Sequence, residues 1–199
     1  MVTNLLLVSF NLSKNERLRK NVKCFSLAGG YAIIKKLKIL RRMIMKILFA
    51  GAGALGSRFG YMLFKNNEDV TFVDTWGEHV ENIRNKGLKV IIDDVDLGNY
   101  YIPIYRPEQI SGKYDVIFVA TKSMQLRPML DSVKHLFHED TKIVCILNGL
   151  GHVETLKDYV KEENILIGVT VWTSGLGGPG ILEAHGTGKI ELKQVKEVN

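Results

Sequence analysis

Cysteine and proline are scarce in this chain, which has two cysteines and four prolines among its 199 residues. Cys24 and Cys145 cannot build a disulfide framework and lack metal-ligand spacing, so we expect free thiols in a reducing, cytoplasmic location. The low proline content and an apolar fraction of 46% exclude long disordered, collagen-like or low-complexity scaffolds. The composition is instead that of a globular protein with a sizeable core.

Long apolar runs and paired histidines are also lacking. No stretch approaches the roughly 20 apolar residues that span a membrane, and residues 5–8 are too short for the apolar region of a secretory signal. We therefore expect no membrane-spanning segment. His79, His152 and His185 stand alone at predicted helix starts or loops, so we interpret them as surface imidazoles and expect no metal site.

The net charge of +6 is concentrated near the N-terminus. Residues 1–44 carry ten basic side chains and one acidic side chain, a net of +9, whereas residues 45–199 carry 17 basic and 20 acidic ones, a net of −3. Because the excess is confined to that segment, we expect no nucleic-acid partner. We interpret residues 1–44 as an unstructured extension, or as upstream sequence before a natural start at Met43 or Met45. A basic amphipathic helix on a membrane surface and a transit peptide are the alternatives.

From residue 45 onward, strand and helix patterns alternate without a break. Short apolar runs predict buried strands, and apolar stripes at helical spacing predict helices between them. The pattern predicts an α/β fold, namely a Rossmann-type, doubly wound, mostly parallel sheet over residues 45–199 with a C-terminal β-hairpin region. The predicted strands are 46–50, 70–73, 114–120, 142–147 and 165–171, with extended segments at 88–92 and 100–105; the predicted helices are 54–66, a short one around 80–83, 126–137 and 153–160.

A glycine-rich motif joins the first predicted strand to the first predicted helix. It has the form G-x-G-x-x-G, in the strand–turn–helix context that dinucleotide binding requires. Gly51 allows a tight turn, Gly53 lets a diphosphate approach the backbone, and Gly56 lets the helix pack close to the strand. The alternative is a turn that only packs the helix on the sheet. The predicted cofactor-binding residues of this turn are Gly51, Ala52, Gly53, Ala54, Leu55 and Gly56.

Asp74 ends the second predicted strand, eighteen residues after Gly56. A carboxylate at this place accepts hydrogen bonds from the ribose hydroxyls of the adenosine and repels a 2′-phosphate. The sequence therefore favours NAD(H) over NADP(H). A solvated carboxylate at a strand end, or a helix N-cap, is the alternative.

Two polar residues follow later strands of the predicted sheet. Lys122 comes after the strand that ends near Ala120, and Asn148 comes after the strand that ends at Leu147. Ligands bind at the carboxyl ends of strands in open α/β sheets, so both are candidate binding residues. An exposed loop lysine and a turn asparagine before Gly149 are equally plausible from position alone.

Four segments of the sequence stand out together, and they occur in this order: Met45-Lys46-Ile47 leading into residues 51–56; Glu78-His79-Val80 with Ile83 and Gly87-Leu88; Val119-Ala120-Thr121-Lys122; and Leu147-Asn148-Gly149. In these segments and in their order, the sequence resembles the ketopantoate reductase (2-dehydropantoate 2-reductase) family over about residues 45–199. Residues 179–180 and 185–188 are similar to that family's hairpin region.

The resemblance implies a reductase that passes a hydride from NADP(H) to the C2 carbonyl of ketopantoate, a step of pantothenate and coenzyme A synthesis. It implies a small 2-keto acid as substrate, with Lys122 and Asn148 lining the nicotinamide and substrate pocket. Asp74 departs from the family, whose members usually present an arginine after the second strand. Members also continue into a helical domain that supplies the general acid, so we assign no catalytic residue here. A homodimer and a missing helical domain are both open.

Three hypotheses follow. The chain is the cofactor domain of a ketopantoate reductase-type enzyme, or a stand-alone dinucleotide-binding module without turnover, or the cofactor domain of another hydroxyacid dehydrogenase. If a helical domain is missing, we also expect an apolar side of the sheet to be exposed to solvent.

Overall fold

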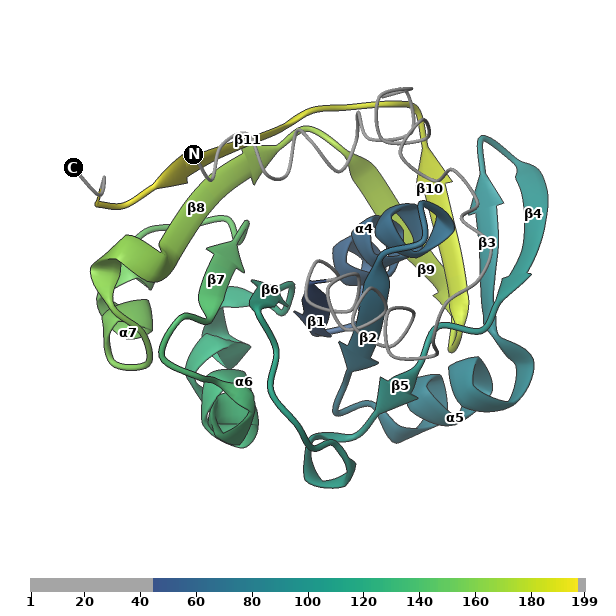
Figure 1. The fold of residues 1–199 in the computed structure, drawn as a ribbon. Coiled ribbons are helices and arrows are strands. Elements are labelled where there is room, and N and C mark those ends of the chain that lie inside the picture. Colours follow the sequence, from purple (N-terminus) through teal and green to yellow (C-terminus); the bar gives the residue numbers. More distant parts are fainter. Residues whose placement is uncertain (1–44, 197–199) are drawn as a thin grey trace, which may run out of the picture. The chain divides into compact units, whose positions relative to one another are not determined.

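Two β-sheets and four α-helices make up the described part of the chain, residues 45–196, in a computed structural model (Figure 1). The interpretations given above for residues 1–44, and for Cys24 among them, lie outside the described residues. The predicted α/β fold with a doubly wound, mostly parallel sheet is confirmed.

The larger sheet has seven strands in the order β11-β8-β7-β6-β1-β2-β5. Neighbouring strands run parallel, except that β11 is antiparallel to β8. All five predicted strands are present, although β6, β7 and β8 are shorter than expected. The bounds are β1 Lys46–Ala50, β2 Asp69–Val73, β5 Ile104–Tyr105, β6 Val116–Val119, β7 Lys142–Cys145, β8 Ile165–Thr170 and β11 Ile190–Gln194.

The helices lie where the apolar stripes predicted them. Three of them (α4, α6 and α7) end earlier than predicted, whereas α5, predicted around 80–83, runs from Gly77 to Lys86. The stretch predicted as one helix over 126–137 changes to a short 3-10 turn at Lys134–Leu136, and the last helix stops at Lys157. The first helix ends where Asn67 takes a φ of +65°, a backbone conformation that asparagine tolerates. The bounds are α4 Ala54–Lys65, α5 Gly77–Lys86, α6 Leu126–Val133 and α7 His152–Lys157.

A second, four-stranded sheet was not predicted from the sequence. Its order is β4-β3-β10-β9, and it joins the expected extended segment 88–92 to the expected C-terminal hairpin through a parallel β3–β10 pair. The prediction of one extended segment over 100–105 was wrong, because β4 ends at Tyr100 and β5 begins at Ile104. The bounds are β3 Leu88–Ile92, β4 Val95–Tyr100, β9 Thr173–Gly178 and β10 Ile181–His185.

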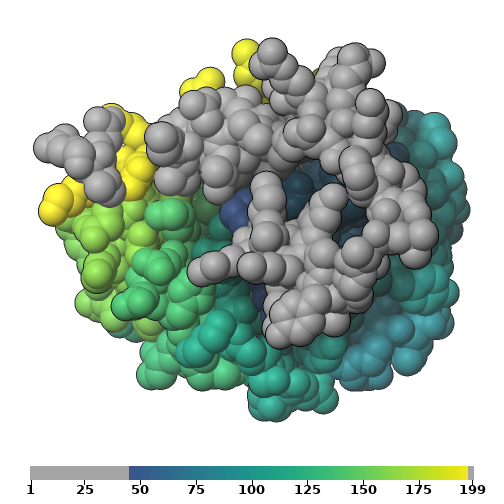
Figure 2. Space-filling model, in the orientation of Figure 1, coloured from purple at the N-terminus to yellow at the C-terminus, as the bar shows by residue number. Residues whose placement is uncertain are grey.

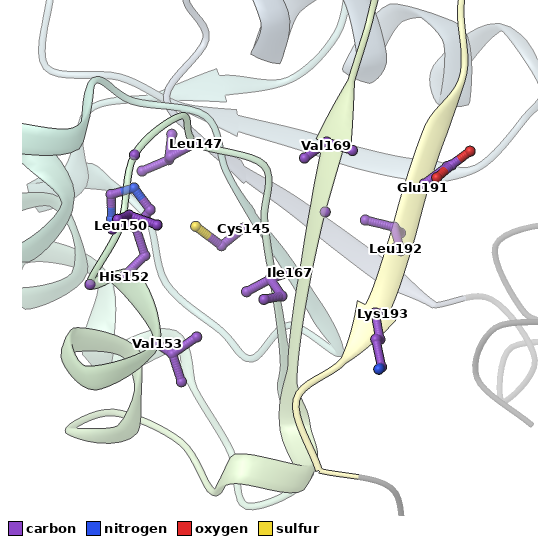
Figure 3. A pocket seen from close by; sticks show the side chains of 13 residues that line it. Cys145, Leu147, Leu150, His152, Val153, Ile167, Val169, Glu191, Leu192 and Lys193 are labelled. Atoms are coloured by element: carbon purple, nitrogen blue, oxygen red, sulfur yellow. The ribbon is translucent and has the colours of Figure 1, made fainter.

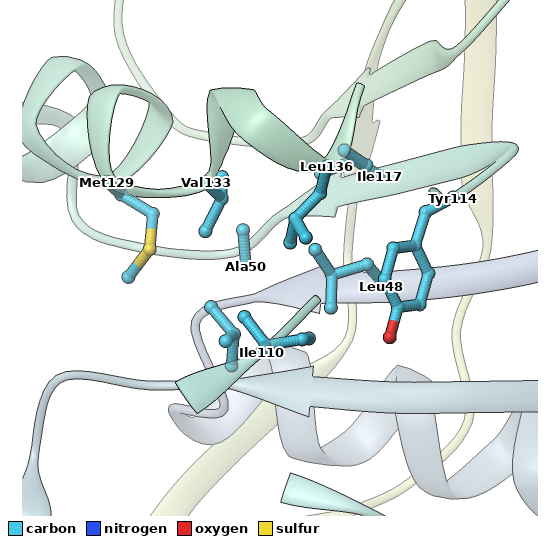
Figure 4. Packing of buried hydrophobic residues seen from close by; sticks show 9 residues of the cluster. Leu48, Ala50, Ile110, Tyr114, Ile117, Met129, Val133 and Leu136 are labelled. Atoms are coloured by element: carbon cyan, nitrogen blue, oxygen red, sulfur yellow. The ribbon is translucent and has the colours of Figure 1, made fainter. Parts of the chain in front are cut away.

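Both faces of β1 are buried, which explains its unbroken apolar sequence. Leu48 and Ala50 pack in a cluster with side chains of α6 and the following turn, including Met129 and Val133 (Figure 4). Phe49, which alternates with them along the strand, stacks on Phe118 at 4.7 Å between ring centroids. Apolar side chains therefore pack against both faces of this central strand.

Helix α4 lies between the two sheets (Figure 1), contacting β1 and β2 on one side and β9 and β10 on the other. In the space-filling view, the green half that carries α6 and α7 and the teal half that carries α5 and the β3–β4 hairpin lie on opposite sides (Figure 2). Among residues 45–196, no helix combines the length and apolar character needed to cross a membrane.

Candidate functional site

The turn between β1 and α4 requires glycine at its first position. Gly51 has a φ of +104°, and its amide donates to the Val73 carbonyl oxygen at 2.8 Å. A Cβ atom there would lie 2.9 Å from the backbone carbonyl of Ala120. The turn is therefore pressed between the carboxyl ends of β2 and β6.

The third and sixth positions of the motif differ in what surrounds them. A Cβ on Gly56 would lie 2.0 Å from the Gly51 carbonyl oxygen, so only glycine lets α4 start this close to β1. Among the residues that the structure describes, a Cβ on Gly53 would meet no atom within 4 Å. Gly53 is the N-cap of α4, and neither a capping side chain nor an acidic residue lies in the first turn. The N-terminus of α4 is thus open to an anion, which its free amides and dipole favour.

Asp74 lies directly beside this turn. Its Oδ2 accepts the amide of Ala52 at 2.7 Å, and its Oδ1 accepts the amide of Trp76 at 2.8 Å. Each carboxylate oxygen can accept a second hydrogen bond, so the half-buried carboxylate keeps capacity for a ribose hydroxyl. The structure thus brings Asp74 together with the glycine turn.

The interpretation of His79 as a surface imidazole was wrong. Its side chain is fully buried, its Nε2 lies 2.8 Å from the Ala52 carbonyl oxygen, and its Nδ1 accepts the Gly180 amide at 2.9 Å. Burial lowers the pKa of His79 below its ordinary value, so the neutral form is favoured. The sequence did hold a signal for this burial, because the i, i+4 spacing to Ile83 puts both residues on the inner face of α5.

Lys122 and Asn148 follow the adjacent strands β6 and β7. Both are exposed, and the two loops are joined by the Ser123 hydroxyl, which donates to the Asn148 carbonyl oxygen at 2.8 Å. The Thr121 hydroxyl oxygen is buried and has no hydrogen-bond partner among residues 45–196. Since Thr121 also lies next to Gly51, this polar edge is continuous with the glycine turn.

Arg58 is a buried residue that sequence reasoning missed. Its guanidinium donates to the carbonyl oxygens of Thr173, His185 and Gly186, and lies 4.2 Å from the centroid of the Trp172 ring. An arginine in an amphipathic helix normally faces solvent, so the sequence pattern gave no signal for this role. The contacts fasten α4 to the ends of β9 and β10.

A pocket of about 520 Å³ lies beyond the glycine turn, between the loop after β7 and strands β8 and β11 (Figure 3). Cys145, Leu150 and Ile167 line it, and neither Lys122 nor Asn148 does. Burial raises the pKa of the Cys145 thiol, which is free. Val169, which also lines the pocket, exposes 66% of its surface, and Val171, just after β8, exposes 75%. Among the described residues, no group of three or more potential ligands is arranged for a metal ion.

These features define a nucleotide-binding Rossmann-type domain. Within residues 45–196, the helix N-terminus at Gly53 is open and the Thr121 hydroxyl has no partner, and the Asp74 carboxylate lies beside the glycine turn. These groups fit the diphosphate and ribose groups of a dinucleotide. All lie at the carboxyl ends of parallel strands, where ligands of open α/β sheets bind.

The family model for ketopantoate reductase PanE/ApbA matches residues 47–197, and the chain belongs to that family. A 2-dehydropantoate 2-reductase from Streptococcus pyogenes is 42% identical over 155 residues, which are 78% of this chain and 50% of that protein. The chain therefore spans about half the length of the curated relatives it matches.

Two solved structures are similar to the described fold. A D-mandelate dehydrogenase with NADH and anilino(oxo)acetate aligns with a TM-score of 0.74 and 40% identity, over 77% of this chain and 49% of that one. A 2-dehydropantoate 2-reductase from Geobacter metallireducens aligns with a TM-score of 0.69 and 34% identity, over 76% and 50%.

Proposed function

We propose that residues 45–196 form the nicotinamide-dinucleotide-binding half of a reductase that converts a 2-keto acid to a 2-hydroxy acid. One observation carries the proposal: the turn over residues 51–56 ends at an uncapped helix N-terminus with open space above Gly53. Family membership and the similarity to a dehydrogenase crystallised with NADH support it.

In this proposal, the turn binds the diphosphate through backbone amides. The amides at the start of α4 have no partner within the helix and point along its axis, so a doubly charged diphosphate satisfies them. Gly53 admits the phosphate oxygens because no side chain stands between them and the backbone. The proposed binding residues are Gly51, Ala52, Gly53, Ala54, Leu55 and Gly56.

We further propose that Asp74 binds the adenosine ribose and favours NAD(H). Its carboxylate is held in place by the amides of Ala52 and Trp76, so it cannot easily turn away from a 2′-phosphate. A fixed negative charge repels that phosphate. NADP(H), the cofactor suggested by the family resemblance, is the alternative.

Lys122 and Asn148 are the proposed contacts at the nicotinamide end. The bound nicotinamide supplies the hydride. The ammonium group of Lys122 would attract the carboxylate of the keto acid, and the side-chain amide of Asn148 would donate to a carboxamide or carbonyl oxygen. The Ser123 hydroxyl holds the Asn148 backbone and so keeps the two loops together.

Ketopantoate is the proposed substrate, because the family and the curated relatives carry that activity in their names. The second candidate is phenylglyoxylate, the 2-keto acid that corresponds to mandelate. The similarity to a D-mandelate dehydrogenase supports this candidate, because its sequence identity and TM-score are at least as high as those of the Geobacter metallireducens reductase.

Titration of the purified chain with NADH and with NADPH, followed by nicotinamide fluorescence, tests the proposal. We expect saturable binding with NADH tighter than NADPH; absence of binding to both would contradict the proposed function. Ketopantoate and phenylglyoxylate are then added separately, and NADH oxidation is followed by absorbance. Oxidation with one of them identifies the substrate class. Binding without oxidation fits both a cofactor-binding half that holds no general acid and a cofactor-binding module without turnover.

A further inference from the structure

Both backbone polar groups of Ala52, in the glycine turn, form hydrogen bonds with side chains. Its amide donates to the Asp74 carboxylate at 2.7 Å. Its carbonyl oxygen accepts the Ser57 hydroxyl at 2.5 Å and also lies 2.8 Å from Nε2 of His79. Three side chains from different parts of the chain thus fix one residue of the turn.

The orientation of the Ala52 carbonyl determines where the next amide points. The carbonyl of Ala52 and the amide of Gly53 belong to one planar trans peptide, in which they point in opposite directions. A tether on the carbonyl oxygen therefore aims the Gly53 amide away from His79. This peptide has glycine on its C-terminal side, and glycine restricts backbone rotation less than other residues do. The hydrogen bonds to the Ala52 carbonyl oxygen therefore limit its rotation.

The two hydrogen bonds of His79 define its protonation state. An amide N–H can only donate, so the contact from Gly180 at 2.9 Å requires an unprotonated Nδ1. In the neutral ring Nε2 then carries the proton and donates it to the Ala52 carbonyl oxygen. The buried ring also stacks on Trp76, with centroids 5.2 Å apart and planes inclined by 11°.

We propose that His79 is a positioning residue for cofactor binding: its Nε2–H holds the Ala52 carbonyl so that the Gly53 amide faces the diphosphate. Its Nδ1 links this tether to the β9–β10 turn at Gly180, which is distant in the sequence. The inference rests on the proposed function of the glycine turn and adds a residue that touches no part of the cofactor itself.

Two substitutions separate the two nitrogen atoms. Glutamine places an amide N–H near the position of Nε2, so His79→Gln keeps a donor for Ala52 and loses the acceptor for Gly180. Asparagine places its oxygen near the position of Nδ1, so His79→Asn keeps the acceptor and loses the donor. Each variant loses one buried hydrogen bond and the stacked ring, so the two should lose similar stability in urea unfolding.

The test is the dissociation constant for NADH of wild type and both variants. We expect His79→Gln to stay within about threefold of wild type and His79→Asn to bind about tenfold more weakly, the effect of one lost hydrogen bond. If wild type binds and the two variants bind equally well, this inference is overturned while the proposed function stands. If wild type binds neither NADH nor NADPH, the proposed function fails first.

A measurement on the wild-type chain covers the case in which the variants do not fold. Imidazole ¹⁵N spectra report which ring nitrogen carries the proton. We expect the Nε2–H tautomer, and slower exchange of that proton with water after NADH is added. The Nδ1–H tautomer, or an exchange rate that NADH leaves unchanged, would overturn the inference.

Discussion

Gly53→Ala should weaken cofactor binding strongly without disturbing the fold. Gly53 has φ −63° and ψ −167°, which alanine adopts readily, and the added Cβ meets no atom of residues 45–196 within 4 Å. Alanine lowers the entropy of the unfolded chain but is a poorer N-cap than glycine. These effects oppose each other, so the free energy of unfolding should change by less than about 1 kcal/mol.

The cost to binding comes from the space that the new methyl group takes. A Cβ on Gly53 would stand where phosphate oxygens approach the amides of the turn, and at least one charge-assisted hydrogen bond would be lost. Such a bond contributes about 1.5–3 kcal/mol, so the dissociation constant for NADH should rise about tenfold to a hundredfold. Fluorescence titration and urea unfolding on the same preparation measure both quantities.

Gly60→Ala is the matched control. A Cβ at Gly60, further along α4, would lie 2.0 Å from the Phe72 ring. Overpacking of this kind costs about 1–3 kcal/mol of stability, whereas the affinity for NADH should stay within about threefold. The reasoning would be refuted if Gly53→Ala bound NADH as wild type does, or if it lost as much stability as Gly60→Ala.

Three further predictions concern charge and burial. Arg58→Met should lower the free energy of unfolding by about 3 kcal/mol, measured in urea, because three carbonyl oxygens lose the charged donor of a buried arginine. Arg127→Met, which removes an exposed ion pair with Asp158, should lower it by less than about 1 kcal/mol. Equal losses would contradict the role of Arg58. Burial lowers the pKa of His79, so the unfolded chain binds this proton at a higher pH than the folded chain. The free energy of unfolding should therefore keep its full value above about pH 6.5 and decrease below that pH, more steeply in wild type than in His79→Gln. Identical pH profiles of the two proteins would contradict this contribution of His79. Asp74→Asn should raise the affinity for NADPH relative to NADH about tenfold, because it removes a repulsion of roughly 1–2 kcal/mol between the carboxylate and the 2′-phosphate. If parallel titrations give an unchanged ratio of the two dissociation constants, Asp74 does not select the cofactor.

The parts of the fold that depend on local pattern were predictable from the sequence. The apolar run of β1, the glycine spacing over residues 51–56 and the stripe of α4 are each contained in a few consecutive residues. Asp74 was predictable as well, because a fixed number of residues separates it from the glycine turn. The structure adds that its carboxylate contacts the Ala52 amide.

The parts that depend on distant pairing were not predictable. The second sheet forms because β3 pairs with β10, and the sequence of neither strand indicates which strand it pairs with. The burial of Arg58 likewise depends on carbonyl groups at the ends of β9 and β10, which the helix pattern cannot show. His79 is the intermediate case, since its helical spacing indicated burial but its partners, Ala52 and Gly180, come from elsewhere.

The most direct test of the account is to map the amides that respond to NADH in ¹⁵N-labelled protein. We predict that the largest chemical-shift changes fall on Gly53, Ala54 and Leu55, and that Gly53→Ala removes them at the same NADH concentration. Changes confined to the pocket around Leu150 and Ile167, with the glycine turn unaffected, would contradict the central claim.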